Sequence, residues 1–316
     1  MLPQKRLMSR SRRKGRPVDG ILLLDKPAGI TSNGALQQVK HLFGAAKAGH
    51  TGSLDPIATG VLPICFGEAT KFSQFLLDAD KSYVATIRLG EQTTTGDSEG
   101  DCVSSRPVPE MSISEAEEYL EPFRGQIEQI PSMYSALKVD GQPLYKLARQ
   151  GIEIERKARS VTIFSLTLLE KTSDTWVIDL VCSKGTYVRT LAEDLGASIG
   201  CGAHVIGLRR RQAGPFRIDE SYSLEKLNEI KTENAVEGLD AALLPVAAAV
   251  EDYPVVEMTD LTASYFQQGQ AVQIAGISGE GMVAVYAATD EDRNFVGVGN
   301  ILDDGRIAPR RLVATR

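Results

Sequence analysis

The chain has 316 residues, 42% of them hydrophobic, which is enough to bury the core of one large domain and a small second one without disulfides or a metal. No apolar run approaches the roughly 20 residues of a membrane-spanning helix, and the "ILLL" run after the basic start is too short for a signal peptide, so a cytoplasmic protein is predicted. A formal net charge of -6 excludes a uniformly basic surface.

The basic residues are concentrated at the start of the chain. Residues 1–18 contain seven basic side chains and no acidic one, which leaves 28 basic against 41 acidic residues in the remainder. A flexible basic arm on an acidic body favours a local contact with a polyanion. A disordered tail that only improves solubility has the same composition and is the alternative.

The first predicted elements surround a glycine-bounded loop. Residues 20–26 are expected to form a buried strand, and a Pro-Gly turn leads to a helix that Ser32 or Asn33 caps. The loop GHTGSLDPIATG, residues 49–60, has neither helical periodicity nor strand alternation. A strand is predicted in residues 60–67, a helix in 68–80 and an alternating strand in 81–90.

Strands and helices also alternate in the rest of the chain. A capping box beginning at Ser114 predicts a helix, and Asp140-Gly141 marks a turn before a short helix that Gly151 ends. Two strands are predicted in residues 159–171 and 175–184, then a helix capped by Thr186 and a strand in 203–216. Composition shifts near residue 250, before short strand-like runs. The pattern predicts an α+β fold with a small β-rich appendage.

Motifs for metal and cofactor chemistry are missing from the sequence. The four cysteines are too scattered for a zinc site or a disulfide framework, so buried reduced thiols are expected at Cys65, Cys102, Cys182 and Cys201. No glycine-rich nucleotide-binding motif, zinc-protease helix or nucleophile elbow is present. No cofactor and no metal are therefore predicted.

Polar residues at the ends of predicted strands and helices are the remaining candidates for chemistry. They are Lys26 and Pro27, the loop from His50 to Asp55, Tyr83, Tyr187 and Arg189. Each has a structural alternative: Asp55 before Pro56 is typical of a turn, Tyr83 on an alternating strand of a core, and Arg189 of a solvated or paired helix residue. Only their combination favours a functional site.

Six segments decide between these alternatives. LLLDKPAGITSN, AGHTGSLDPIATGVLPICFGEATKFSQ, DKSYVATIRLG, QIPSMYSALKVDGQPLYKLARQG, SKGTYVRTLAEDLG and GAHVIGLRRRQAGPF resemble, in this order, the TruB family of bacterial tRNA pseudouridine synthases. The resemblance runs from about residue 19 to the end, because GVGNILDDGRIAPRRLV is similar to the family's C-terminal domain. It implies a mixed, mainly antiparallel sheet of pseudouridine-synthase type flanked by helices. It divides the chain into an arm (1–18), a catalytic domain with an RNA-binding insertion (19–250) and a PUA-like domain (251–316).

The resemblance also implies a reaction. Family members convert the uridine at nucleotide 55 in the tRNA T-loop to pseudouridine without a cofactor, after flipping the base into a pocket. Asp55 matches the catalytic aspartate, which either attacks covalently or shuttles a sugar proton. Arg189 matches its arginine partner, expected to hold the pKa of Asp55 down. Tyr83 matches the tyrosine that stacks on the uracil and helps to remove the C5 proton.

Further residues are assigned to RNA binding by the same resemblance. Tyr187 and Leu208 match pocket residues, His50 matches the histidine that contacts T-loop bases, and Lys26 with Pro27 is expected to shape the pocket floor. Phosphate contacts are expected from the arm and from Lys71, Lys138, Arg149, Arg209, Arg210 and Arg211. In the C-terminal domain, which is acidic, Arg310 and Arg311 are expected to touch RNA.

The predicted partner is the T-arm of tRNA, with no membrane, no protein partner and a monomeric enzyme. Two other functions stay open. One is pseudouridine formation in another RNA or under a guide RNA, against which the missing lysine-rich tail and the bacterial spelling of the motifs argue. The other is a tRNA-binding or tRNA-folding chaperone whose catalysis is incidental.

Overall fold

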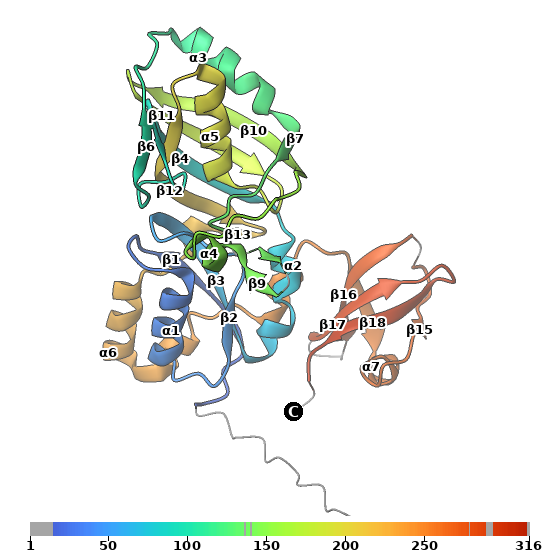
Figure 1. Ribbon diagram of the computed structural model, residues 1–316. Coiled ribbons are helices and arrows are strands. Elements are labelled where there is room, and N and C mark those ends of the chain that lie inside the picture. Colours follow the sequence, from blue (N-terminus) through green and yellow to red (C-terminus); the bar gives the residue numbers. More distant parts are fainter. Residues whose placement is uncertain (1–14, 136, 140, 278, 289–292, 315–316) are drawn as a thin grey trace, which may run out of the picture.

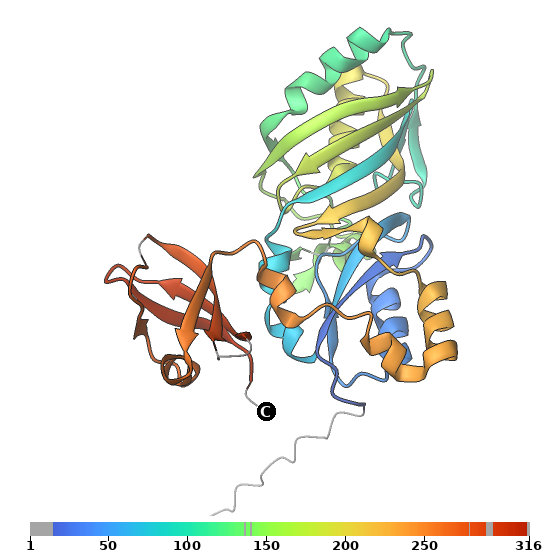
Figure 2. The ribbon, with the colours of Figure 1, turned by 180° about the vertical axis from the view of Figure 1, so that it is seen from behind.

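The computed structural model describes residues 15–135, 137–139, 141–277, 279–288 and 293–314. Two separate sheets dominate it, one of nine strands and one of five (Figures 1 and 2). Within the described residues, no helix is long and apolar enough to span a membrane. The α+β prediction and the β-rich C-terminal unit are confirmed.

The large sheet has the order β1-β3-β12-β4-β11-β10-β7, with β2 beside β3 and β13 beside β12. Every pairing is antiparallel except that of β12 with β3. Its strands are β1 (Gly20–Lys26), β2 (Ala48–His50), β3 (Ala58–Phe66), β4 (Lys81–Leu89), β7 (Gly125–Gln129), β10 (Arg159–Lys171), β11 (Thr175–Cys182), β12 (Ala203–Ala213) and β13 (Phe216–Arg217).

Two pairs of helices cover the two halves of this sheet (Figure 1). Helices α1 (Ser32–Leu42) and α6 (Leu224–Asp240) pack on the half with β1 and β3, where Val39 and Leu227 join one core. Helices α3 (Ile113–Leu120) and α5 (Val188–Ile199) pack on the other half, where Leu191 and Leu120 join a second core. The apolar spacing in each helix supplies the buried stripe.

The small sheet has the order β14-β16-β17-β18-β15 and packs with α7 (Asp260–Gln267). Its contact with the larger body includes an apolar cluster: the rings of Phe72 and Phe295 are 5.4 Å apart, and Ala284 and Val298 join a core with Val61 and Phe216. Its strands are β14 (Val255–Thr259), β15 (Val272–Gln273), β16 (Gly281–Ala288), β17 (Arg293–Ile301) and β18 (Arg306–Leu312).

Short elements connect these layers. They are the 3₁₀ turns η1 (Gly67–Lys71), η2 (Glu121–Phe123), η3 (Ile218–Glu220) and η4 (Val246–Val250), the helices α2 (Ser73–Leu77) and α4 (Leu144–Ala148), and the hairpins β5 (Glu91–Thr93) with β6 (Cys102–Ser105) and β8 (Lys138–Val139) with β9 (Gln142–Pro143). The helix predicted over 68–80 is thus split into η1 and α2. Asp140, predicted in a turn, lies outside the described residues.

The predicted helix caps are wrong by one or two residues. Thr31 caps α1, because the hydroxyl of Ser32 is taken up by the backbone of Leu54. The capping box of α3 begins at Ser112, whose hydroxyl accepts from the backbone N–H of Glu115 while that carboxylate accepts from the backbone N–H of Ser112. At α5, the N-cap position is occupied by Tyr187 and not by Thr186.

Two further predictions need correction. The flexible arm predicted over 1–18 is too long, because residues 16–18 belong to the body: Arg16 pairs with Asp240 at 2.5 Å and donates to the carbonyl of Phe43, and Val18 is buried. Residues 1–14 lie outside the described residues. Cys102, on the β5–β6 hairpin, is exposed, whereas the other three thiols are buried and all four are free.

Candidate active site

A cavity of about 420 Å³ opens where the two halves of the large sheet meet. Tyr83 and Leu208 lie at this junction, because both pack against each of the two cores. The loop between β2 and β3, the start of α5 and the segment after β7 complete the walls. Among the lining residues are Gly52, Asp55, Lys81, Tyr83, Tyr134, Ser135, Tyr187, Arg189, Leu208 and Arg210.

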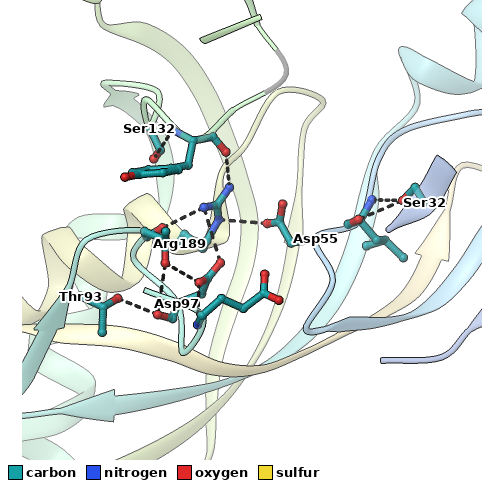
Figure 3. Close-up of polar contacts among 10 residues, drawn as sticks. Ser32, Asp55, Thr93, Asp97, Ser132 and Arg189 are labelled. Atoms are coloured by element: carbon teal, nitrogen blue, oxygen red, sulfur yellow. Dashed lines mark hydrogen bonds and ion pairs between the residues drawn. The ribbon is translucent and has the colours of Figure 1, made fainter. Parts of the chain in front are cut away.

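The loop that carries Asp55 is anchored on both sides of the carboxylate. The hydroxyl of Ser32 accepts from the backbone N–H of Leu54 at 2.7 Å and donates to the Leu54 carbonyl at 2.9 Å (Figure 3). The backbone N–H of Gly29 donates to the carbonyl of Pro56 at 2.8 Å. These hydrogen bonds on both sides hold the Asp55 carboxylate in a fixed position, as a catalytic group requires.

The side chain of Lys26 also holds this loop through hydrogen bonds. Its side chain is fully buried, and its ammonium donates to the carbonyls of Pro27 at 2.8 Å, Ile30 at 2.7 Å and Pro56 at 3.4 Å. Burial lowers the pKa of Lys26 to about 8, although Asp55 raises it. Neither Lys26 nor Pro27 is among the residues that line the cavity. Lys26 therefore holds the Asp55 loop from behind the cavity wall, and the predicted role of Lys26 and Pro27 in shaping the pocket floor stays a prediction.

Arg189 meets Asp55 across the cavity (Figure 3). Its Nε lies 3.0 Å from Oδ2 of Asp55, so the Asp55 loop and the first turn of α5 are joined by an ion pair. Arg189 also donates to the carbonyls of Thr95 at 2.8 Å and Tyr134 at 2.9 Å. Its side chain is only 6% exposed, which leaves the guanidinium a single orientation.

Asp97 is a second carboxylate on Arg189, and sequence reasoning missed it. Its Oδ2 lies 3.5 Å from Nη1 of Arg189, and its side chain is 3% exposed. Oδ1 accepts from the hydroxyl of Thr95 at 2.5 Å and from the backbone N–H of Glu99 at 3.1 Å. In the sequence Asp97 lies in a polar, turn-rich stretch, where an aspartate has no distinguishing signal.

The charge state of Asp55 follows from burial more than from Arg189. Burial raises the pKa of the Asp55 carboxyl above its usual value, and the Asp97 carboxylate acts in the same direction, while Arg189 and Lys26 lower it. Arg189 therefore lowers this pKa as predicted, but burial outweighs its effect and the net direction is upward. The Asp55 side chain is still 38% exposed to the cavity, which leaves it accessible to a substrate.

This raised pKa predicts an effect of pH on both activity and stability. If Asp55 must be ionised to act, the single-turnover rate falls on the acidic side with a midpoint above pH 3.8, the ordinary pKa of an aspartate carboxyl. The protonated carboxyl is favoured in the folded state, so its contribution to stability is present below pH 3.8 and lost as the pH rises through the folded-state pKa. Asp55→Asn is therefore expected to melt at the same temperature as the wild type, or higher, at neutral pH.

Rate profiles from pH 4 upward and thermal melts of both proteins check this expectation. A rate that stays at its plateau down to pH 4 would contradict the raised pKa. So would an Asp55→Asn protein that melts well below the wild type at neutral pH.

Three of the predicted pocket residues line the same cavity as Asp55. Tyr83 on β4 and Leu208 on β12 lie on adjacent strands, with Arg210 opposite Tyr83 in the ladder. Tyr187 precedes α5, and its backbone N–H donates to the side chain of Gln129 at 3.0 Å. Burial raises the pKa of the hydroxyls of Tyr83 and Tyr187, so both are neutral and able to donate.

His50 lies at the end of β2, paired with Ile64, and is not among the residues that line the cavity. Burial lowers its pKa, and the nearby Arg210 acts in the same direction, so the imidazole is neutral at physiological pH. Within the described residues its Nδ1 is buried without a hydrogen-bond partner. A buried polar atom with no partner is uncommon and is consistent with a group that a ligand satisfies.

The sequence is similar to those of known proteins. The model of the TruB family pseudouridylate synthase N-terminal domain matches residues 40–188, and two models of TruB C-terminal domains match residues 189–251 and 254–313. The chain is 54% identical over 301 residues to tRNA pseudouridine synthase B of Coxiella burnetii, with 95% of this chain and 96% of that protein covered. The chain belongs to the TruB family. It is also 56% identical over 313 residues to tRNA pseudouridine synthase B of Tolumonas auensis, covering 97% and 96%.

Solved structures similar to this TruB-family chain confirm the fold. A crystal structure of a Cbf5-Nop10-Gar1 complex contains a chain that matches with a TM-score of 0.71 and 26% identity, over 93% of this chain and 84% of that one. An H/ACA ribonucleoprotein bound to a substrate RNA containing 2'-deoxyuridine also matches, with a TM-score of 0.71 and 24% identity over 98% and 93%. The pseudouridine-synthase sheet and the PUA-like C-terminal unit are therefore confirmed.

The predicted phosphate-binding cations of this TruB-family chain fall into three groups. Lys138, Arg149, Arg310 and Arg311 are exposed. Lys71, Arg209 and Arg211 already pair with carboxylates, at 2.6 Å with Glu68, 2.8 Å with Asp25 and 3.2 Å with Asp179. Arg210 is buried and faces the cavity, so it is out of reach of a phosphate on the surface. Within the described residues, no group of three or more His, Cys, Asp or Glu side chains is arranged to hold a metal ion.

Proposed function

We propose that this protein isomerises uridine to pseudouridine at nucleotide 55 in the T-loop of tRNA. The observation that carries the proposal is the pairing of Asp55 with Arg189 at 3.0 Å in a cavity that Tyr83 and Leu208 also line. Identity of 52–56% to proteins named tRNA pseudouridine synthase B supports tRNA as the substrate.

The proposed reaction needs no external reagent, because its atoms balance. The bond from N1 of the base to the sugar breaks, the base turns, a bond from C5 to the same sugar carbon forms, and the hydrogen lost from C5 is balanced by one gained at N1. A base within a folded loop cannot reach a cavity of this kind, so base flipping precedes the chemistry. Asp55 then lies on one wall with the aromatic ring of Tyr83 available for stacking.

Asp55 has two chemical options in this arrangement. Its accessible carboxylate can attack the sugar carbon covalently, or it can remove and return a sugar proton. Arg189 holds the carboxylate in place in either case, and Asp97 holds Arg189. The ion pair therefore orients the reacting group rather than taking part itself.

Substituting Tyr83 by phenylalanine is expected to lower turnover by about 100-fold, the size of effect typical of a missing proton-transfer group. The ring is retained, so stacking is retained, and the dissociation constant for tRNA should change by less than about threefold. Single-turnover kinetics and filter binding measure the two effects. An equal loss of both would contradict a chemical role for the hydroxyl.

The basic residues near the start of the chain are proposed to contact RNA phosphates. Because Arg16 belongs to the body, the matched deletion removes residues 1–14, which contain six basic side chains. The slope of log affinity for tRNA against log salt should become shallower by about 0.7 for each phosphate that the shortened protein no longer neutralises. An unchanged slope would show that this segment does not bind RNA.

The remaining proposals concern organisation and context. We place the boundary of a separate RNA-binding unit near residue 250, with the exposed Arg310 and Arg311 of β18 as its cationic contacts. The enzyme is proposed to act as a monomer in the cytoplasm. Guide-RNA control is disfavoured because identity to the chains of the solved ribonucleoprotein complexes is only 24–26%, about half the identity to the tRNA enzymes.

Mapping of the product tests the substrate directly. A tRNA transcript incubated with the protein is treated with carbodiimide, which leaves an adduct on pseudouridine that stops reverse transcriptase. A single stop at the T-loop uridine is expected, and none when that uridine is replaced by cytidine. Stops elsewhere in the transcript, or none, would contradict the proposed site.

A further inference from the structure

Arg210 is a buried cation that has no assigned role in the proposed reaction. It is among the largest fully buried side chains, with 1% exposure. Its Nε donates to the carbonyl of Val61 at 2.8 Å, and Nη2 donates to the carbonyl of Gly52 at 3.3 Å. Unlike its neighbours Arg209 and Arg211, it forms no ion pair with a carboxylate among the described residues. Such a charge is costly to bury, so a stabilising role alone does not account for it.

The strand register fixes where this side chain lies. Arg210 on β12 is opposite Tyr83 on β4 and opposite Gly60 on β3. Gly60 has φ +107, and a Cβ there would lie 2.2 Å from the carbonyl oxygen of Arg210. The two backbones can approach this closely only because residue 60 is glycine. The guanidinium is thus held between β3, β4 and the loop that carries Asp55.

Arg210 also lies beside Tyr83. The two residues are directly opposite each other on β12 and β4, so their side chains are on the same face of the sheet, and both line the cavity. Burial raises the pKa of the Tyr83 hydroxyl, and the positive charge of Arg210 acts against the rise. A guanidinium can only donate hydrogen bonds, so toward Tyr83 it presents donors and no acceptor. The same cation donates to the carbonyl of Gly52, three residues before Asp55.

We propose that Arg210 is a positioning residue that sets the Tyr83 hydroxyl relative to the Asp55 loop. The proposal rests on the proposed function, since it assigns a task within that reaction. Arg210 is too deeply buried to bind a tRNA phosphate, so its loss affects the chemical step and not the binding of tRNA. A displacement of a reacting group by about 1 Å costs on the order of 100-fold in rate.

A double-mutant cycle tests the connection. Arg210→Lys keeps the charge but loses the planar set of N–H donors of the guanidinium. Tyr83→Phe removes the hydroxyl oxygen that can accept a hydrogen bond. The third variant combines both substitutions. Arg210→Gln, which keeps amide donors for the carbonyls of Val61 and Gly52, takes the place of Arg210→Lys if that protein does not fold. Arg88→Lys is the matched control, because Arg88 is on the same strand as Tyr83 but pairs with Asp174 on the surface at 3.2 Å.

Arg210→Lys is expected to lower the single-turnover rate by about 100-fold in the wild-type background and by less than about threefold in the Tyr83→Phe background. The dissociation constant for tRNA stays within about threefold in all variants, and Arg88→Lys has the wild-type rate. Multiplicative losses in the double variant, or weaker tRNA binding that accounts for the slower rate, would overturn the inference. A wild-type protein without activity would instead refute the proposed function.

Discussion

Asp55→Asn is expected to lower the rate of pseudouridine formation by at least about 10⁴-fold, the scale seen when a catalytic carboxylate is removed from a preorganised site. The asparagine side chain has the same shape but cannot attack the sugar carbon or accept a proton. Arg189 remains fixed by Asp97 and two carbonyls, so the cavity should keep its form. The dissociation constant for tRNA should therefore change by less than about threefold.

Single-turnover kinetics and filter binding with the same tRNA measure both quantities. Asp174→Asn is the matched control, because Asp174 forms a surface ion pair with Arg88 and does not line the cavity. Retained turnover in Asp55→Asn would refute the catalytic role. A cell that depends on the protein and grows normally with Asp55→Asn would favour the alternative of a tRNA-folding chaperone.

Arg189→Met is expected to have the largest effect on stability, a loss of about 3–5 kcal/mol in the free energy of unfolding. Asp97, 3% exposed, would lose its cation, and the carbonyls of Thr95 and Tyr134 would lose their donor. Turnover should be lost as well, because Asp55 is no longer oriented. Urea unfolding of the wild type and the variant measures the stability.

The comparison with Asp55→Asn makes this prediction specific. Arg189 has two carboxylate partners, so removing Asp55 leaves it paired, whereas removing Arg189 leaves Asp97 unpaired. Arg189→Lys, which keeps the charge, should lose less stability than Arg189→Met. Equal stability of Arg189→Met and the wild type would show that the network does not support the fold.

The sequence predicted the layers of the fold because strand and helix periods are local signals. The apolar stripe of α1 and the alternation of β4 are visible in the chain and are found in the structure. Helix caps were misplaced where a hydroxyl had another partner: Ser32 binds the Asp55 loop, so Thr31 caps α1. Such competition depends on contacts between distant segments and is not visible in the sequence.

Only a part of the candidate site was predicted. The resemblance correctly brought Asp55, Arg189 and Tyr83 to one cavity. It did not indicate Asp97, whose role depends on burial beside Arg189. It assigned Arg210 to RNA phosphate, although three consecutive arginines on a strand alternate between its faces and the middle one points inward.

Tritium release is the measurement that tests the central claim most directly. A tRNA transcript labelled with tritium at uridine C5 releases the label to water only when C5 becomes bonded to the sugar. The wild type is expected to release the label from the T-loop uridine, and Asp55→Asn and a transcript without that uridine are expected to release none. Tight binding of tRNA by the wild type without any release of tritium would contradict the account.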